Sequence, residues 1–336
     1  MRCNLLLVLS TIVFLFVFTS CQKEISYTDP NIQDSVVNVS VDDGVKVTAS
    51  VNGVITDENG DPVSGAIVKC GSQSVTTNTF GTFYFKNIAI SKNNGSVVVN
   101  KSGYFKGFRN FLTSAGKSHF LRIQLLRHDI TATIPSSAGG TVDLGNGASI
   151  VFPANAFAYS NGTLYSGNVK VFAKKMRPEE SSFHLVMPGD LRGIQKNGKE
   201  AVLSNYGIIG SDFTDESGNV LVIAANKKAS LEFPVPVATP DSISLWHFDE
   251  SRARWIQEGT AIKSNGKVRA EVSKFSFWAI NTAAGFVRMS CVIMNSIDST
   301  PVVNQLVRLT VQGTNESAYG YTACTGFIMG GVPVNK

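Results

Sequence analysis

Short stretches in which apolar and polar residues alternate cover most of the chain beyond residue 46, and turns rich in Gly, Asn and Asp separate them. A period of two residues is typical of β-strands that bury one face. In the first third of the chain the alternation marks residues 51–56, 66–70, 82–85, 96–101 and 120–126. Several short strands at such spacing predict an all-β protein built of tandem antiparallel β-sandwiches.

Two polar turns between such stretches predict β-hairpins. Asn59-Gly60 lies between residues 51–56 and 66–70, and both residues tolerate the positive φ that tight hairpin turns need. Residues 242–248 and 254–257 flank the second turn. Trp246 and Trp255 are the largest apolar side chains there, each able to bury on the order of 200 Å². We expect both to pack in a core, and the alternative is an exposed aromatic platform for a sugar ligand.

The first residues, 1–20, have the pattern of a secretory signal peptide. Arg2 precedes an apolar run from Leu5 to Phe18, and the small residues Thr19-Ser20 follow it. The run is shorter than the roughly 18 apolar residues that a membrane-spanning helix needs. We therefore expect this segment to be removed on export.

The end of this segment, together with Cys21, resembles the lipobox of bacterial lipoproteins, in which the cysteine is lipidated and becomes the first mature residue. Gln22-Lys23-Glu24 follows, and is similar to the signal that sends lipoproteins of the Bacteroidota to the outer face of the outer membrane. The resemblance implies a lipid on Cys21, the membrane as a partner, and exposure to the cell exterior. Phe18 departs from the usual Leu, Val or Ile, and an ordinary signal cut elsewhere is the alternative. Residues 21–46 are polar and predict a flexible tether.

Composition and charge narrow the classes of function. The chain has 336 residues, enough for two or three domains. Its formal net charge of +5 is spread along the sequence without runs of like charge. Nucleic-acid-binding proteins cluster basic residues on one face, so this distribution argues against a nucleic-acid partner. The aromatic and basic stretch at 104–111 is explained by a strand with two alternating faces.

Three cysteines remain once the signal peptide and Cys21 are set aside. They are Cys70, Cys291 and Cys324, and none has a spacing that suits zinc. A disulfide between Cys291 and Cys324 and buried free thiols both stay open. We expect neither a metal nor a cofactor.

Spaced glycines and apolar residues form a set within residues 47–127. The set reads Gly53-x-x-x-Asp57-x-x-Gly60-x-Pro62-Val63-x-Gly65-Ala66-x-Val68, then Thr77-x-x-x-Gly81-x-Phe83-x-Phe85, then Lys101-x-Gly103-Tyr104. It resembles the carboxypeptidase regulatory-like domain. The resemblance implies a non-catalytic sandwich of seven or eight strands in the prealbumin and carbohydrate-binding-like group. Asp57 and Asp61 offer oxygen ligands that suit calcium, although a solvated turn is the simpler interpretation.

Residues 128–283 carry a second set of features. They include Gly139-Gly140-Thr141, the apolar stretch 149–157 with its Pro153, and the Trp-containing stretches 245–255 and 272–278. These resemble a bacterial surface-protein version of the ZU-five and UPA pair, which implies a tandem of β-sandwiches, immunoglobulin-like in their layering.

Residues 284–336 repeat the first set. Leu306-Val307-Arg308 matches Ile67-Val68-Lys69, and Thr322-x-x-x-Gly326 matches Thr77-x-x-x-Gly81. No counterpart of residues 97–126 follows, so we interpret this region as a second, incomplete carboxypeptidase regulatory-like domain.

The four histidines and one serine-containing stretch bear on whether the chain is an enzyme. His119, His128, His184 and His247 have no metal-binding or triad spacing, and we expect His119 and His128 at the surface. The function-to-find domains, relatives of the ZU-five and UPA pair, cleave themselves at His-Phe-Ser, where this chain has Lys274-Phe275-Ser276. A lysine protonated at neutral pH is a poor base, so we expect no cleavage between Phe275 and Ser276, and Phe275 and Phe277 should share one face of a final strand.

Three serines follow an aspartate in a pattern that resembles the O-glycosylation sites of the Bacteroidota. They are Ser35, Ser242 and Ser299, of which Ser35 in the tether is the most accessible candidate.

Together these features predict a non-catalytic, lipid-anchored cell-surface protein for binding, adhesion or scaffolding, with a glycan or protein partner. One alternative is a carbohydrate-binding accessory lipoprotein that presents glycan to an enzyme or transporter. Another is a self-processing surface protein. Exposed aromatic side chains in a shallow groove would favour glycan binding.

Overall fold

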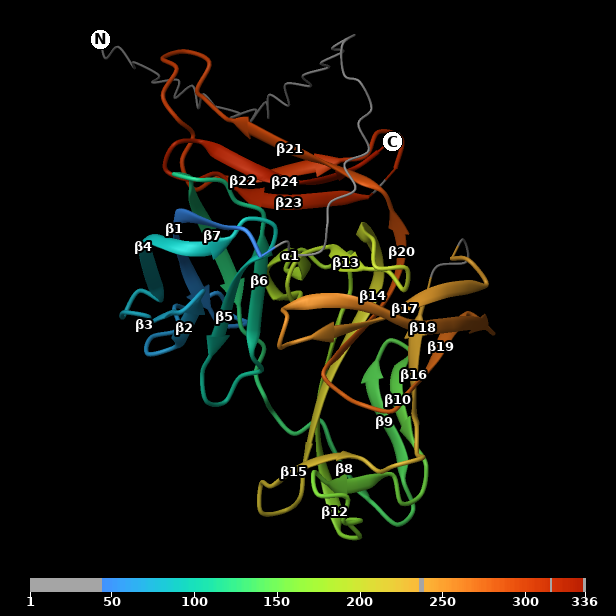
Figure 1. The fold of residues 1–336 in the computed structure, drawn as a ribbon. Helices are drawn as coiled ribbons and strands as arrows, with labels where there is room; N and C mark the ends of the chain where they lie inside the picture. Colours follow the sequence, from blue (N-terminus) through green and yellow to red (C-terminus); the bar gives the residue numbers. More distant parts are fainter. Residues whose placement is uncertain (1–43, 236–238, 315, 335–336) are drawn as a thin grey trace, which may run out of the picture. The chain divides into compact units, whose positions relative to one another are not determined.

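The computed structural model describes residues 44–235, 239–314 and 316–334 (Figure 1). The predicted signal peptide, Cys21, Ser35 and all of the tether up to residue 43 lie outside them. The described part has 24 strands and one short helix, which confirms the all-β prediction. Within it, no helix is long and apolar enough to span a membrane.

The first sandwich consists of seven strands in two sheets, with the orders β4-β1-β7 and β3-β2-β5-β6. Alternate residues of both sheets, among them Val51, Val68 and Phe85, point inward and form its core. The strands are β1 (Lys46–Thr56), β2 (Ile67–Cys70), β3 (Gln73–Thr76), β4 (Thr82–Ser91), β5 (Gly95–Asn100), β6 (Gly107–Phe111) and β7 (Ser118–Gln124).

The hairpin predicted around Asn59-Gly60 is wrong. β1 pairs with β4 and β7, whereas β2 pairs with β3 and β5, so the two strands belong to opposite sheets. The polar turn carries the chain across the core, and only one isolated bridge, Thr56 to Pro62, links its two sides. The alternation of apolar and polar residues is the same in both cases, because two strands bury alternate residues whether they face each other in opposite sheets or pair in one hairpin.

The central region is one hydrogen-bonded network of 13 strands. The predicted hairpin of residues 242–248 and 254–257 is confirmed, because β17 pairs antiparallel with β18. The strands are β8 (Ala132–Pro135), β9 (Gly140–Gly145), β10 (Ala148–Phe152), β11 (Phe157–Tyr159), β12 (Asn168–Met176), β13 (Arg192–Ile194), β14 (Glu200–Thr214), β15 (Val220–Ile223), β16 (Ala229–Pro234), β17 (Ser242–Asp249), β18 (Arg254–Ser264), β19 (Lys267–Val272) and β20 (Phe277–Ala284), and the helix α1 is Phe183–Val186.

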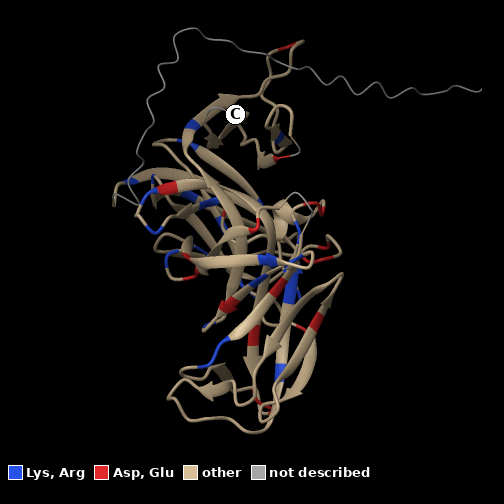
Figure 2. Ribbon diagram, turned by 90° about the vertical axis from the view of Figure 1, so that its right-hand side faces the viewer, with Lys and Arg blue, Asp and Glu red and all other residues tan. Residues whose placement is uncertain are grey.

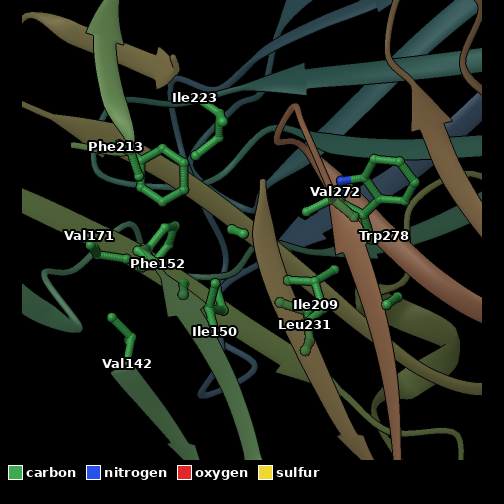
Figure 3. Packing of buried hydrophobic residues seen from close by; sticks show 14 of the residues in the cluster. Val142, Ile150, Phe152, Val171, Ile209, Phe213, Ile223, Leu231, Val272 and Trp278 are labelled. Atoms are coloured by element: carbon green, nitrogen blue, oxygen red, sulfur yellow. The ribbon is translucent and has the colours of Figure 1, made fainter. Parts of the chain in front are cut away.

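A large apolar cluster fills the interior of this network. Figure 3 shows Phe152 and Phe213 beside each other in it, and their ring centroids are 5.3 Å apart in an edge-on arrangement. Phe275 also packs against this cluster, together with Trp278, whereas Phe277 belongs to a different cluster. The prediction that Phe275 and Phe277 share a face is therefore wrong, because the regular strand begins only at Phe277.

The last region consists of two sheets of two strands each. β21 (Phe286–Val292) pairs with β24 (Phe327–Pro333), and β22 (Leu306–Thr310) pairs with β23 (Ser317–Tyr321).

His119 is buried at 8% exposure, so its predicted surface position is wrong. It lies on the same face of β7 as the core residues Leu121 and Ile123. Its Nε2 is 2.7 Å from the hydroxyl of Thr113, and burial lowers the pKa of the imidazole to about 4. The ring is therefore neutral at physiological pH.

Candidate functional site

A shared apolar cluster joins the first sandwich to the central region. Phe105, just before β6, and Phe108, in β6, pack with three residues of the hairpin of β17 and β18: Trp246, Phe248 and Trp255. Both faces of β6 are buried, since four of its five residues are buried. This cluster makes the two regions one packed unit.

Trp246 and Trp255 are exposed by only 0% and 2%, which confirms core packing. The indole nitrogen of Trp255 donates to the carbonyl of Pro188 at 3.1 Å. Neither ring presents a face to a ligand, so the alternative of an aromatic platform at these two residues is wrong.

A buried ionic cluster lies at the same junction. The guanidinium groups of Arg192 and Arg254, each 3% exposed, both contact the fully buried carboxylate of Glu200. Both also donate to the carbonyl oxygen of Asn93 in the first sandwich, at 3.0 and 3.2 Å. Arg288 of β21 donates to the side chain of the same asparagine. One loop of the first sandwich is therefore hydrogen-bonded to both later regions.

Beside this junction lies a cleft of about 1530 Å³, the candidate functional site. Its walls come from β6 and β7, from residues 175–192 around α1, from β14, and from the hairpins of β22 to β24. No single stretch of sequence contributes more than a part of it. A concave site of this size is ample for an oligomeric ligand.

Aromatic rings line one wall of the cleft. His184 stacks on Tyr319 with ring centroids 4.7 Å apart, and Tyr321 lies edge-on to Phe120 at 5.9 Å. Tyr319 is 42% exposed, so part of its ring faces solvent. Arg308 lies over this ring at 5.8 Å from its centroid, in a cation–π geometry.

The cleft is cationic. Its lining includes six Lys or Arg residues against three Asp or Glu residues. In Figure 2 the positions of Lys and Arg are interspersed with those of Asp and Glu over the described part of the chain. The basic lining residues are Arg109, Arg122, Lys175, Arg177, Arg192 and Arg308.

Arg109 is a buried cation that lines the cleft toward α1. Its Nη2 donates to the carbonyl of Leu185 at 3.0 Å, while its Nε has no hydrogen-bond partner. Burial lowers the pKa of Arg109 to about 10, and the charge of Asp190 opposes that shift. Arg109 stays charged at neutral pH, and burial together with its charge lowers the pKa of His184. A buried cation of this kind favours an anionic ligand.

Lys274 and Ser276 have separate partners in the structure. The Ser276 hydroxyl donates to Glu250 at 2.9 Å, and the Lys274 ammonium donates to Glu258 at 2.6 Å. Glu250 also pairs with Lys106 at 3.1 Å. The lysine therefore bonds to a carboxylate rather than to the serine, and the absence of self-cleavage stays a prediction.

We expect purified protein to remain a single band under denaturing conditions after long incubation at neutral pH. Ser276→Ala should give the same band, because the hydroxyl serves only as a donor to Glu250. Two fragments that meet at Phe275–Ser276 and disappear in Ser276→Ala would show instead that a base activates the serine.

The other predicted site residues lie apart from the cleft. The Asp57 carboxylate accepts the backbone N–H groups of Asn59 and Asp61 and pairs with Arg127 at 3.5 Å, so it serves the turn itself. Among the residues that the structure describes, no group of three metal-ligating side chains occurs. Ser242 and Ser299 are exposed, and their glycosylation stays a prediction.

The three cysteines of the described part are free thiols. Cys70 is buried, and burial raises its pKa to about 12. Cys291 is half-buried and Cys324 is exposed, with no disulfide between them.

Sequence reasoning missed the cleft itself. Arg109, His184 and Tyr319 come from three distant segments, and each alone reads as an ordinary strand or loop residue. The interpretation of 104–111 as a strand with two alternating faces gave no sign that Arg109 is buried beside a cleft.

No protein-family model matches the sequence. The chain is 24% identical over 221 residues to cartilage intermediate layer protein 1 of Mus musculus, which covers 61% of this chain and 18% of that protein. It is 28% identical over 110 residues to the same protein of Sus scrofa, covering 32% of this chain and 18% of that protein. The chain thus spans less than a fifth of the curated relatives that it matches.

Solved structures show only distant likeness. The TIE protein of Bacillus anthracis gives a TM-score of 0.21 at 12% identity, covering 85% of this chain and 44% of that one. The Streptococcal ancillary pilin gives 0.20 at 10% identity, covering 68% and 59%. The major pilin BcpA of Bacillus cereus gives 0.17 at 10% identity, covering 85% of each chain.

Proposed function

We propose that this chain is a non-catalytic binding protein, held at the cell surface by a lipid on Cys21, and that its cleft binds an anionic glycan. The observation that carries the proposal is the cleft, where the partly exposed ring of Tyr319 and an excess of arginines meet. Sugar rings pack on aromatic faces through their apolar C–H groups, and carboxylated or sulfated sugars pair with guanidinium groups. The resemblance of the first and last regions to carboxypeptidase regulatory-like domains supports a binding role.

Replacing Tyr319 with alanine should weaken binding of an acidic oligosaccharide by about tenfold or more, because one well-placed aromatic contact contributes on the order of 1–2 kcal/mol. A panel of neutral and uronic-acid oligosaccharides, measured by titration calorimetry, would identify a ligand first. Tyr84→Ala is the matched control, since Tyr84 is 57% exposed on β4 and lies outside the cleft. Equal weakening by both substitutions, or binding of neutral sugars only, would contradict the proposal.

Replacing Cys21 with alanine should release the protein from the membrane fraction of an expressing bacterium. The wild-type chain should stay with the membrane in high salt, because two or more acyl chains anchor a protein far more firmly than one. Membrane fractionation that is the same for both proteins would argue for an ordinary signal peptide cut elsewhere.

A further inference from the structure

The sheet β4-β1-β7 of the first sandwich has an outer face, formed by the residues that point away from the core (Figure 1). The strand registers set these residues in rows across the three strands. One row consists of Tyr84 of β4, Asn52 of β1 and Phe120 of β7, because Asn52 lies opposite both of the others. Phe120 also lines the cleft, so this row leads from the cleft onto the sheet.

The two aromatic residues of this row are spaced like binding positions along a chain-like ligand. Two strand spacings, about 10 Å, separate the backbone at Tyr84 from that at Phe120, which is close to the length of a disaccharide in an extended glycan. Gly53, the next residue of β1, permits this approach of β7, since a Cβ there would meet the carbonyl oxygen of Leu121. Tyr84 is 57% exposed, so its ring is open to a ligand.

The same outer face is positively charged. Lys86 and Arg122 are exposed and lie two residues beyond Tyr84 and Phe120, so each shares the face of its aromatic neighbour. Lys46 adds a third exposed cation at the start of β1. Within β1, β4 and β7, all of which the structure describes, no Asp or Glu occurs. The face therefore attracts anionic groups.

Two carboxylates follow β1 directly, and both are paired. Asp57 lies 3.5 Å from the guanidinium of Arg127, and Glu58 lies 2.9 Å from the ammonium of Lys174. These pairs compensate the negative charge of the turn, so the cations of the sheet keep their excess.

Arg122 and Phe120 connect this face to the aromatic wall of the cleft. Both residues line the cleft. The guanidinium of Arg122 lies 5.9 Å from the ring centroid of Tyr321, and Phe120 lies edge-on to the same ring. Tyr321 belongs to β23, as does Tyr319. Aromatic rings and cations thus continue from the cleft onto the sheet.

We propose, on the basis of the function proposed for the cleft, that its ligand is a polymer: an acidic polysaccharide that fills the cleft and continues across β7, β1 and β4. Phe120 and Tyr84 contact the apolar faces of its sugars, and Arg122 and Lys86 pair with its carboxylate groups. Since β4 is the edge strand of this sheet, the polymer leaves into solvent there. The site therefore takes internal segments of a polysaccharide as well as its ends.

The test compares galacturonic-acid oligomers of increasing length, from the dimer to the polymer, by titration calorimetry. The affinity of the wild-type chain should rise with length until the oligomer reaches Tyr84. Tyr84→Ala should weaken binding of the polymer by about fivefold or more. It should leave binding of the dimer unchanged, because the dimer fits within the cleft. Lys86→Gln should act in the same way, whereas Tyr319→Ala should weaken binding of both.

Two further variants serve as controls. Tyr84→Phe keeps the aromatic ring and should bind the polymer as tightly as the wild-type chain. Lys69→Gln removes an exposed cation from β2, in the opposite sheet of the same sandwich, and should change neither affinity. Weakening by Lys69→Gln as large as that by Lys86→Gln would contradict a path across β4.

Three results would overturn the proposal in different ways. If dimer binding depends on Tyr319 but the polymer binds no tighter and ignores Tyr84→Ala, the cleft is the whole site and the extension is wrong. If no acidic oligomer binds, the function proposed for the cleft is wrong, and the extension falls with it. If polythymidylate binds as tightly as the galacturonic-acid polymer and is weakened equally by Lys86→Gln, the face accepts any polyanion and the assignment to a glycan is wrong.

Discussion

Replacing Trp255 with alanine should lower the free energy of unfolding by about 3–5 kcal/mol, the usual cost of removing a large aromatic side chain from a packed core. The indole is 2% exposed, lies edge-on to Phe248 at a centroid distance of 5.1 Å, and belongs to the cluster that includes Phe105 and Phe108. The loss should therefore also weaken the packing of the first sandwich on the central region. The carbonyl of Pro188 would in addition lose the hydrogen bond that it accepts from the indole N–H.

Ile262→Ala is the matched control for this substitution. Ile262 lies in the same strand, β18, but is 55% exposed, and its truncation should change the free energy of unfolding by less than about 1 kcal/mol. Chemical denaturation measures both values. Equal losses for the two variants would contradict the assignment of Trp255 to a shared core.

Replacing Glu200 with leucine should destabilise the protein by about 3–5 kcal/mol, because it leaves the buried guanidinium groups of Arg192 and Arg254 without their shared carboxylate. Asp190, at 2.7 Å from Arg192, would still pair with the charge of that arginine but not with the charge of Arg254. The carbonyl of Asn93 accepts from both arginines, so hydrogen exchange in the loop of residues 91–95 should rise as well.

Glu271→Leu provides the comparison for Glu200. Glu271 pairs with Lys228, and these side chains are 69% and 61% exposed, so its removal should cost less than about 1 kcal/mol. A Glu200 variant that unfolds at the same denaturant concentration as the Glu271 variant would show that the buried cluster contributes nothing to stability.

The alternation of apolar and polar residues predicts several strands of the first sandwich, but not which strands pair. β4, β5 and β7 lie where residues 82–85, 96–101 and 120–126 predicted them. The turn at Asn59-Gly60 has the sequence of a hairpin, yet it connects two sheets, because the choice between neighbouring and facing strands depends on the whole core rather than on four residues. Turn chemistry alone carries no information about it.

The sequence likewise does not show that a strand is buried on both of its faces. β6 packs on its own sandwich with one face and on the central region with the other. Its sequence therefore shows no simple alternation of apolar and polar residues, and both Arg109 and Asn110 are buried. Polar residues are tolerated there because each finds a partner: Arg109 donates to Leu185, and Asn110 donates to the carbonyl of Ala253. Such partners come from residues far along the chain, so the cleft and the ionic cluster could not be predicted locally.

Gly53 of β1 and Cys291 of β21 hold equivalent positions, two residues before the N–H that bonds to Gly81 in one copy and to Gly326 in the other. This difference bears on how the chain folds. Two copies with the same strand order in one polypeptide can exchange strands, and tandem repeats misassemble in this way. If β7 paired with β21 in place of β1, the carbonyl of Leu121 would meet the side chain of Cys291, where the first copy has only hydrogen. A single side chain thus makes the wrong pairing unfavourable, and divergence between the copies protects each sandwich from capturing the strands of the other.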